Sequence, residues 1–249
     1  MQCVRSGLRG LSWVVVWWTL PNYAPGSPMP SKRPPRQRLL RTADIDAFFS
    51  LLAERIVPQA ELDWESCFDL LVAVVLSAQC TDRAVNRVTE RLRRLCPGPR
   101  DYLDLGEEAL QAEIRSIGLF RNKARFILGI CRELLARFGG EVPSCREDLE
   151  SLPGVGRKTA SVVLNVGFGQ PTQAVDTHVF RVSNRVGLVR AKNPLETERQ
   201  LLTKVPQRFM LHAHHYLILH GRYTCKARKP DCRECPAAGL CTWPSKTLV

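Results

Sequence analysis

The sequence predicts an all-α fold, because helical periodicity runs through nearly the whole chain from Asp44 onward. Apolar residues recur there at helical spacing, and no convincing alternating strand interrupts them. A helix-start signal supports this, since Ser144 and Glu147 form the S-x-x-E pattern of a capping box. A chain of 249 residues that is 45% hydrophobic is also long enough to bury a sizeable core.

Four helices are predicted before residue 140. The segment 44–57 is amphipathic and stops at Pro58, whereas 68–77 is almost wholly apolar, as in a helix buried inside a bundle. Thr81 can cap a third helix that runs to about residue 95. A fourth helix covers 120–138 and is closed by two glycines.

The second half of the chain is predicted to be helical as well. Asn193, Pro194 and Glu196 place an N-cap, a first-turn proline and a third-position acid in order. Helices are expected at 157–168, 177–186, 194–204 and 207–222.

The charge balance suits a polyanionic partner. The sequence has 36 Lys and Arg against 24 Asp and Glu, a net charge of +12. Seven basic residues precede the first acidic one, and these are Arg5, Arg9, Lys32, Arg33, Arg36, Arg38 and Arg41. Without them 29 basic residues face 24 acidic ones, so the rest of the chain keeps a moderate charge of +5.

Residues 1–40 are predicted to be a disordered or mis-assigned N-terminal extension. The apolar run 11–20 is too short to span a bilayer, which takes about 20 residues, and no clear cleavage site follows it. Residues 21–38 have the composition of a linker. We favour a dispensable or mis-assigned extension, with Met29 as an alternative start. An organelle-targeting peptide is the second interpretation and an export signal the third.

Most of the ten cysteines do not indicate disulfides. Cys67, Cys80 and Cys131 lie in apolar helical patterns, where a reduced, buried thiol is the expected state. A reducing compartment follows.

The stretch LPGVGRKTA, at 152–160, predicts a helix-hairpin-helix. It is similar to a nucleotide phosphate loop, but Arg157 stands where that loop needs a glycine. Gly154 and Gly156 allow a sharp turn between a helix ending near Leu152 and a helix starting at Arg157. Amides at the start of the second helix could hold one DNA phosphate; an ordinary turn between helices is the alternative.

Lys158, inside the second helix of this hairpin, is a candidate nucleophile. A lysine amine is almost fully protonated at pH 7, so this role needs a nearby acid or base. Asp176, 18 positions further on in AVDTHVF, is the candidate partner. A phosphate counter-charge and a helix N-cap are the alternative roles of these two residues.

Four cysteines near the C-terminus predict a metal centre. Cys225, Cys232, Cys235 and Cys241 form C-x6-C-x2-C-x5-C. A zinc ribbon has two C-x2-C pairs, whereas only one is present here, so the spacing suits an iron–sulfur cluster better. The same loop carries four basic residues suited to phosphate contact, namely Lys226, Arg228, Lys229 and Arg233.

In combination, the motifs LSAQCTD, IGLFRNKA, LPGVGRKTA, AVDTHVFRV and HGRYTC and the cysteine spacing resemble endonuclease III, a DNA glycosylase and abasic-site lyase family. The resemblance covers roughly 41–241. It implies a six-helix barrel domain at 60–170 with the hairpin, and a second domain formed by 41–59 and 171–249. The second domain would hold a [4Fe-4S] cluster on the four cysteines.

The resemblance also implies a function in base excision repair. A monomer would bind double-stranded DNA containing a damaged pyrimidine or an abasic site, across the cleft between the two domains. No membrane association is expected. A bacterial source would place the protein in the cytoplasm at the nucleoid, and a eukaryotic source in an organelle or the nucleus.

Residue roles follow from the same resemblance. Lys158 would attack the anomeric carbon of the deoxyribose, Asp176 would stabilise the positive charge that develops, and the Schiff base would permit β-elimination. Gln79 would fill the space left by the flipped base and Leu119 would intrude on the opposite side; a buried helix-end glutamine and a core leucine are the alternatives. The other expected DNA contacts are Gly154, Val155, Gly156, Arg157, Lys226 and Lys229.

Several signals remain without a function. A solvated helix face is the preferred interpretation of the row Arg83, Arg87, Arg91 and Arg94. A metal site is not expected at the cluster His212, His214 and His215, which has no nearby carboxylates in the sequence. His178 matches the family but has no assigned role.

Three rival functions fit the sequence less well. Mismatch adenine glycosylases usually lack the hairpin lysine and carry a further C-terminal domain, whereas Lys158 is present here and the chain ends eight residues after Cys241. The same lysine disfavours a thymine-mismatch glycosylase. A non-catalytic iron–sulfur DNA-binding module or redox sensor would not need Lys158 and Asp176.

Overall fold

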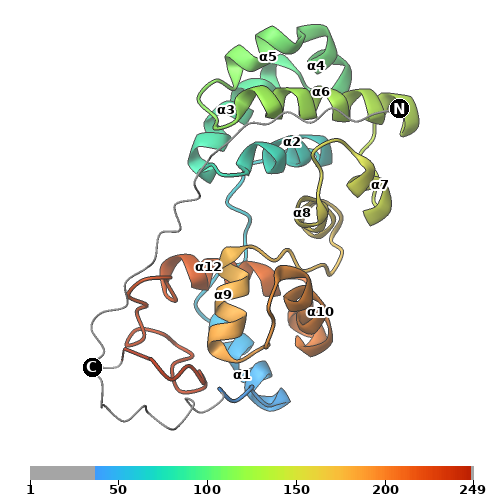
Figure 1. The fold of residues 1–249 in the computed structure, drawn as a ribbon. Helices are drawn as coiled ribbons and strands as arrows, with labels where there is room; N and C mark the ends of the chain where they lie inside the picture. Colours follow the sequence, from blue (N-terminus) through green and yellow to red (C-terminus); the bar gives the residue numbers. More distant parts are fainter. Residues whose placement is uncertain (1–36, 248–249) are drawn as a thin grey trace, which may run out of the picture. The chain divides into compact units, whose positions relative to one another are not determined.

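The computed structural model describes residues 37–247, which belong to one compact unit (Figure 1). Within these residues the chain forms twelve α-helices and no strand, which confirms the predicted all-α fold. The ordered fold already includes Gln37, whose side chain donates to the carbonyls of Asn184 and Arg185. Leu40 is buried in the core. The remainder of the predicted extension and the apolar run 11–20 lie outside the described residues.

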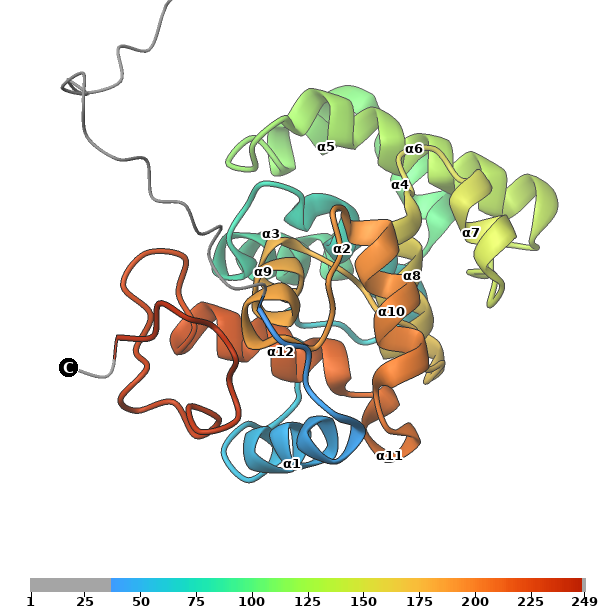
Figure 2. The same cartoon turned by 60° about the horizontal axis from the view of Figure 1, so that its bottom comes forward.

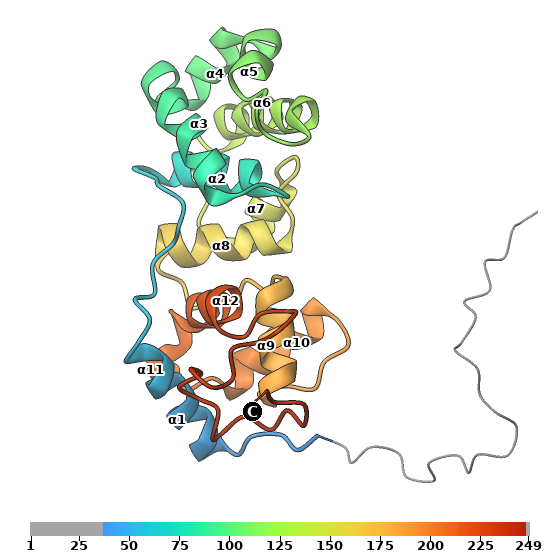
Figure 3. The ribbon, with the colours of Figure 1, turned by 90° about the vertical axis from the view of Figure 1, so that its left-hand side faces the viewer.

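The helices fall into two groups, each built around its own hydrophobic core (Figure 3). The first group follows the chain without interruption and contains α2 (Cys67–Ser77), α3 (Asp82–Leu95), α4 (Pro99–Leu105), α5 (Glu107–Glu113), α6 (Phe120–Arg137), α7 (Arg146–Ser151) and α8 (Arg157–Phe168). The second group combines the first helix with the last ones, and contains α1 (Thr42–Ala53), α9 (Thr177–Val186), α10 (Pro194–Lys204), α11 (Gln207–Met210) and α12 (Ala213–Tyr223).

Helix α2 is the centre of the first group. Its residues from Phe68 to Leu76 are all buried, as its nearly continuous apolar sequence predicts. It packs against α3, α6 and α8, while α4 and α5 pack against α6 and α7 packs against α8. This arrangement fixes the first residues of α8, which include Lys158, beside the C-terminal end of α2.

Helix α12 has the corresponding place in the second group, where it packs against α9 and α1 (Figure 2). Phe48 and Phe49 of α1 are fully buried, and Phe48 meets His220 of α12 edge to face. The segment 225–247 contains no helix and follows directly after α12. The four cysteines of the predicted metal centre are therefore on turns supported by α9 and α12.

Most of the predicted helix starts are confirmed. The Thr81 hydroxyl accepts from the amide of Ala84, and the Asn193 side chain accepts from the amide of Glu196. The cap predicted at Ser144 is wrong by one residue, because Cys145 precedes the first residue of α7 and its sulfur accepts from the amide of Asp148. Two short helices, α4 and α5, were not predicted from the sequence.

The single helix predicted at 207–222 is wrong, because the structure divides it into α11 and α12. Two buried amides explain the break. Gln173 donates to the carbonyl of Met210, and Asn165 donates to the carbonyl of Leu211. These carbonyls would otherwise accept the hydrogen bonds that continue a helix. The same two contacts join the two groups of helices.

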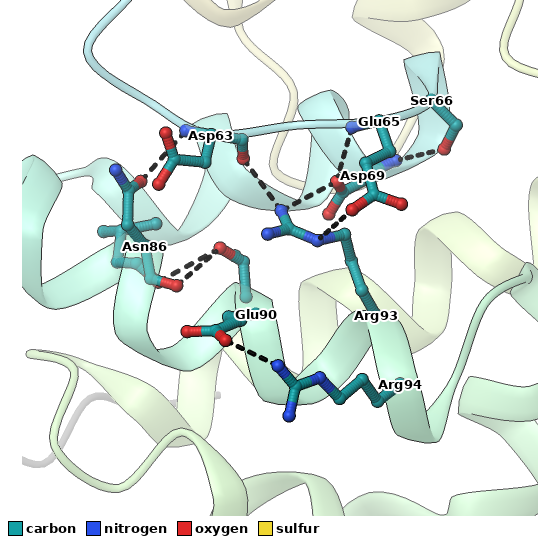
Figure 4. A network of polar contacts seen from close by, with 10 residues as sticks. Asp63, Glu65, Ser66, Asp69, Asn86, Glu90, Arg93 and Arg94 are labelled. Carbon is teal, nitrogen blue, oxygen red and sulfur yellow. Dashed lines mark hydrogen bonds and ion pairs between the residues drawn. The ribbon is translucent and has the colours of Figure 1, made fainter.

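A polar network anchors the segment before α2 to helix α3 (Figure 4). Arg93 donates to the carboxylate of the buried Asp69 and to the carbonyl of Asp63, and it pairs with Glu65. Burial raises the pKa of Asp69, although Arg93 favours the ionised form. Asn86 binds the backbone of Glu61 and Asp63. The network fixes the segment that leads into α2. This segment includes Glu61, which lines the cavity described below.

No helix in the described part of the chain is long and apolar enough to cross a membrane.

Candidate functional site

A cavity of about 230 Å³ is lined by both Lys158 and Asp176. Its walls come from the segment 59–62, the C-terminal end of α2 with the following loop, and the start of α8. The N-terminus of α9 and one face of α12 complete it. The sequence placed the two candidate catalytic residues 18 positions apart, and the fold places them on one cavity.

Each of the two residues stands near the start of a helix. Lys158 is the second residue of α8 and is exposed. Asp176 is the N-cap of α9, and its Oδ1 accepts from the amide of Val179 at 2.7 Å. The capping role that the sequence left open for Asp176 is therefore real, and it orients a carboxylate that also lines the cavity.

A second carboxylate in this cavity was missed by the sequence analysis. Asp82, the first residue of α3, lines the cavity and receives a hydrogen bond of 2.6 Å from Arg222 of α12. Arg222 also pairs with Glu61. Burial raises the pKa of Asp82, and the nearby Lys158 ammonium opposes that shift. The available signal was the position of Asp82 at the end of the motif LSAQCTD.

Two adjacent histidines of α12 line the opposite side of the cavity. The rings of His214 and His215 lie 4.0 Å apart, centre to centre, and neither Nδ1 atom has a hydrogen-bond partner. Burial lowers the pKa of His214 well below its ordinary value and that of His215 to about 4. Both imidazoles are therefore neutral at pH 7, so each ring carries one N–H donor and one acceptor nitrogen. The predicted absence of a metal site here rests on the sequence alone.

The burial of His215 predicts an acid-sensitive fold. Because its pKa is about 4 in the folded chain and about 6.5 in an unfolded one, the unfolded state binds more protons between these values. Its contribution to the free energy of unfolding is complete above pH 6.5 and is lost as the pH falls toward 4. The free energy of unfolding should decrease between pH 7 and pH 4.5 in both proteins. We expect this decrease to be about 2 kcal/mol smaller in His215→Gln than in the wild type. Urea unfolding at the two pH values measures this, and equal losses in both proteins would contradict it.

The predicted hairpin has the geometry that its glycines suggest. Helix α7 ends at Ser151 and α8 begins at Arg157. Gly154 has a φ of +74°, and a Cβ there would lie 2.5 Å from the Phe126 ring. Gly156, the N-cap of α8, has an ordinary φ of −96° and open space around it. The turn thus needs a glycine at 154 for its conformation, while Gly156 keeps the start of α8 accessible.

Replacing these glycines should separate the two requirements. Gly154→Ala is expected to destabilise the fold by about 2–4 kcal/mol, because it combines a strained φ with a clash near the base of the Phe126 side chain. Gly156→Ala is the matched control and should cost less than about 1 kcal/mol, because it changes only the N-cap residue of α8. Thermal or urea unfolding of both variants is the measurement. Equal stability of the two variants would show that the turn tolerates a side chain at 154.

Two other hairpin residues that were predicted to contact DNA, Val155 and Arg157, make contacts within the fold. Val155 is buried in the first core. Arg157 donates to both carboxylate oxygens of Glu198 on α10, at 2.6 and 3.2 Å. The Glu198 side chain is only 5% exposed. Val155 would therefore contact DNA only through its backbone, whereas the Arg157 side chain links α8 to α10 and is still 45% exposed.

The two predicted wedge residues share an uncommon backbone conformation. Gln79 has a φ of 58° and Leu119 a φ of 60°, in the left-handed region that non-glycine residues rarely adopt. Leu119 is 56% exposed, so it is not the core leucine that was its alternative. Lys229, in the cysteine loop, has a φ of 50°. All three non-glycine residues of positive φ in the described part of the chain are predicted DNA contacts.

The four C-terminal cysteines line a second cavity, together with Arg185, His220, Trp243 and Lys246. All four are free thiols. Arg185 donates to the sulfur of Cys225 and to the carbonyl of Lys226, and it stacks on Trp243. Among residues 37–247, no group of three or more His, Cys, Asp or Glu side chains is arranged to hold a metal ion. Four thiols and two cationic side chains around one cavity fit an iron–sulfur cluster in their donor chemistry and charge.

Comparisons with known proteins identify the family. The sequence model of the HhH-GPD superfamily of base excision DNA repair proteins matches residues 72–207. Endonuclease III of Treponema pallidum is 51% identical over 205 residues, which are 82% of this chain and 97% of the relative. Endonuclease III of Escherichia coli K12 is 51% identical over 192 residues, 77% of this chain and 91% of the relative.

Solved structures agree with the sequence relatives. A trapped covalent intermediate of an endonuclease III with DNA has a TM-score of 0.77 and 47% identity, and the match covers 82% of this chain and 96% of the other. A thermostable thymine-DNA glycosylase has a TM-score of 0.72 at 24% identity, over 81% of this chain and 96% of the other, which shows a shared fold alone. The chain therefore belongs to the HhH-GPD superfamily of base excision DNA repair proteins and, within it, to the endonuclease III family of DNA glycosylases and abasic-site lyases.

Proposed function

We propose that the protein removes oxidised pyrimidines from duplex DNA and then cleaves the abasic strand through a Schiff base on Lys158. The observation that carries this proposal is the cavity shared by Lys158 and Asp176, directly beside the hairpin. An amine, a carboxylate and an enclosed space for a base are the groups that the two steps require.

In the first step the Lys158 amine attacks the anomeric carbon of the damaged nucleotide, and the bond to the base breaks. Asp176 stabilises the positive charge that develops on the sugar and assists proton removal from the amine. Asp82, which accepts a hydrogen bond from Arg222, is a second carboxylate on the cavity and would also favour positive charge there. His214 and His215 offer neutral hydrogen-bonding groups to the polar edge of that base.

In the second step the Schiff base acidifies the neighbouring sugar carbon. Loss of a proton from that carbon expels the phosphate on the 3′ side and cuts the strand. Water then releases Lys158 from the sugar. One amine thus serves both steps, which is why a single lysine in this position indicates a bifunctional enzyme.

DNA contact is assigned to the surfaces around this cavity. Support comes from the DNA complexes of endonuclease III among the similar structures. The amides at the start of α8 would hold a backbone phosphate, at the positive end of the helix dipole. Gln79 would fill the space left by the flipped nucleotide and Leu119 would intrude on the opposite side, while Lys226 and Lys229 would contact phosphates further along.

A [4Fe-4S] cluster on Cys225, Cys232, Cys235 and Cys241 completes the proposal. When bound, it would stiffen the loop that carries Lys226 and Lys229. The two hydrophobic cores support two domains, 60–170 and 41–59 with 171–249, with the DNA between them. The relatives are bacterial, so the bacterial nucleoid is the proposed place of action, and a monomer is the proposed working state.

Borohydride trapping tests the proposal directly. The purified protein is incubated with a duplex that contains one oxidised thymine, and borohydride is added to reduce any Schiff base. A covalent protein–DNA band together with strand cleavage is the expected result. Cleavage without a trapped band would indicate a hydrolytic nuclease. Binding without cleavage or trapping, on duplexes with oxidised pyrimidines and with abasic sites, would favour the DNA-binding module.

A further inference from the structure

Lys123 is a buried lysine that the proposed mechanism does not use. It lies in the first turn of α6 and is only 3% exposed. Its Nζ donates to the carbonyl of Leu76 at 2.9 Å, to the carbonyl of Ala78 at 2.6 Å, and to the sulfur of Cys80 at 3.4 Å. Three donors thus meet three acceptors, so the hydrogen-bonding capacity of the ammonium group is fully used.

The acceptors surround the C-terminal end of α2 and the loop that carries Gln79. This end of a helix has exposed carbonyls and the negative part of the helix dipole, which together compensate a buried positive charge. Gln79 lies between two of the acceptors in the sequence, and its left-handed φ of 58° costs about 1–3 kcal/mol, which the surrounding contacts must offset. The Lys123 side chain supplies such contacts on both sides of Gln79.

The backbone of Lys123 holds the other predicted wedge residue. Its amide donates to the carbonyl of Leu119 at 3.1 Å, the first hydrogen bond of α6. Leu119 is the N-cap of α6 and also has a positive φ. The two loops are neighbours, since a Cβ on Gly118 would lie 3.7 Å from the Cys80 sulfur and 3.9 Å from the Gln79 carbonyl.

We propose that Lys123 is a positioning residue that holds Gln79 and Leu119 at a fixed separation, so that the two side chains enter the DNA duplex as one unit. This inference rests on the proposed function, in which these residues flank the flipped nucleotide. Base flipping costs stacking and pairing energy, and a wedge offsets that cost only if its loop is rigid before DNA binds.

The test compares Lys123→Met with the wild type in single-turnover base release from a duplex that pairs an oxidised thymine with adenine. We expect at least a tenfold slower release. The control is Arg132→Met, an exposed basic residue on the same helix, which should release the base within about twofold of the wild-type rate. Lys123→Met should reduce trapping on a single-stranded abasic oligonucleotide far less than it reduces base release from the duplex, because no duplex has to be opened.

A fluorescence readout separates positioning from a merely structural role. A duplex with 2-aminopurine opposite a tetrahydrofuran abasic analogue reports unstacking of the opposite base without any chemistry. Saturating wild-type protein should raise the fluorescence, and Lys123→Met should reduce that rise by more than half. In a chain that already has Gln79→Ala and Leu119→Ala, adding Lys123→Met should slow base release by less than about twofold, because the residues it positions are gone.

A Lys123→Gln variant keeps the test decisive if the methionine variant does not fold. Glutamine has two N–H donors in place of the three of lysine, and we expect a fluorescence rise smaller than that of the wild type. Wild-type base release and fluorescence in the lysine variants would overturn the inference. The inference would also be overturned if Lys123→Met slowed base release as strongly in the Gln79→Ala, Leu119→Ala protein as it does in the wild type. Failure of the wild type itself to release the base would instead refute the proposed function.

Discussion

Lys158→Ala is expected to abolish covalent trapping and to slow strand cleavage at an abasic site by on the order of 10³-fold or more. The amine is the only group of Lys158 that can form a Schiff base, and the alanine variant keeps the cavity, the hairpin and the carboxylates. DNA binding should therefore decrease only modestly. Trapping gels, cleavage kinetics and equilibrium binding to an abasic duplex measure the three quantities.

Lys158→Arg distinguishes the nucleophile from the positive charge. A guanidinium remains protonated and cannot form the Schiff base, but it can still attract a phosphate. We expect this variant to bind abasic DNA like the wild type and to give no trapped band. Lys192→Ala, at an exposed lysine before α10, is the matched control for loss of a lysine. Normal trapping by Lys158→Ala would transfer the catalytic role to another amine and would refute the proposed mechanism.

The sequence predicted the parts of the site that depend on short motifs. The hairpin glycines and the four cysteines were found from local spacing and residue chemistry, whereas Lys158 and Asp176 were only candidates on those grounds and received their roles from the resemblance to endonuclease III. The fold places Lys158 and Asp176 on one cavity and the four cysteines on another. Helix boundaries with side-chain caps, at Thr81 and Asn193, were also predicted correctly.

What the sequence did not predict depends on contacts between distant residues. Asp82 and Lys158 are 76 positions apart in the chain. They line the same cavity because α3 and α8 both pack on α2 or its C-terminal loop. The Lys123 side chain meets carbonyls more than 40 residues away, and an isolated lysine in a helical pattern gives no signal of this. The break between α11 and α12 likewise comes from amides at 165 and 173. Periodicity cannot reveal a hydrogen-bond acceptor that belongs to another helix.

The loss of one proposed cluster ligand is expected to have the second large effect. Cys232→Ser should prevent assembly of the cluster, so that the protein loses its broad visible absorption and its iron and sulfide, about four of each per chain in the wild type. The loop 225–241 contains no helix, and its described side-chain anchors come mainly from Arg181, Arg185 and Lys246. Without the cluster these contacts alone must order it. We expect a large decrease in thermal stability and in the yield of folded protein.

Cys145→Ser is the matched control, because Cys145 is an exposed thiol whose sulfur caps α7, and a serine hydroxyl can make the same cap. It should keep the iron content and melting temperature of the wild type. The comparison also separates the two cavities, since α8 and the hairpin belong to the first core and the cysteine loop to the second. Any Cys232→Ser protein that remains folded should still form the Schiff base on single-stranded abasic DNA, while binding duplex DNA more weakly through the loosened Lys226 and Lys229. If Cys232→Ser contained iron at the wild-type level, Cys232 would not be a cluster ligand. If folded, iron-free protein no longer formed the Schiff base, the cluster loop would also shape the cavity around Lys158.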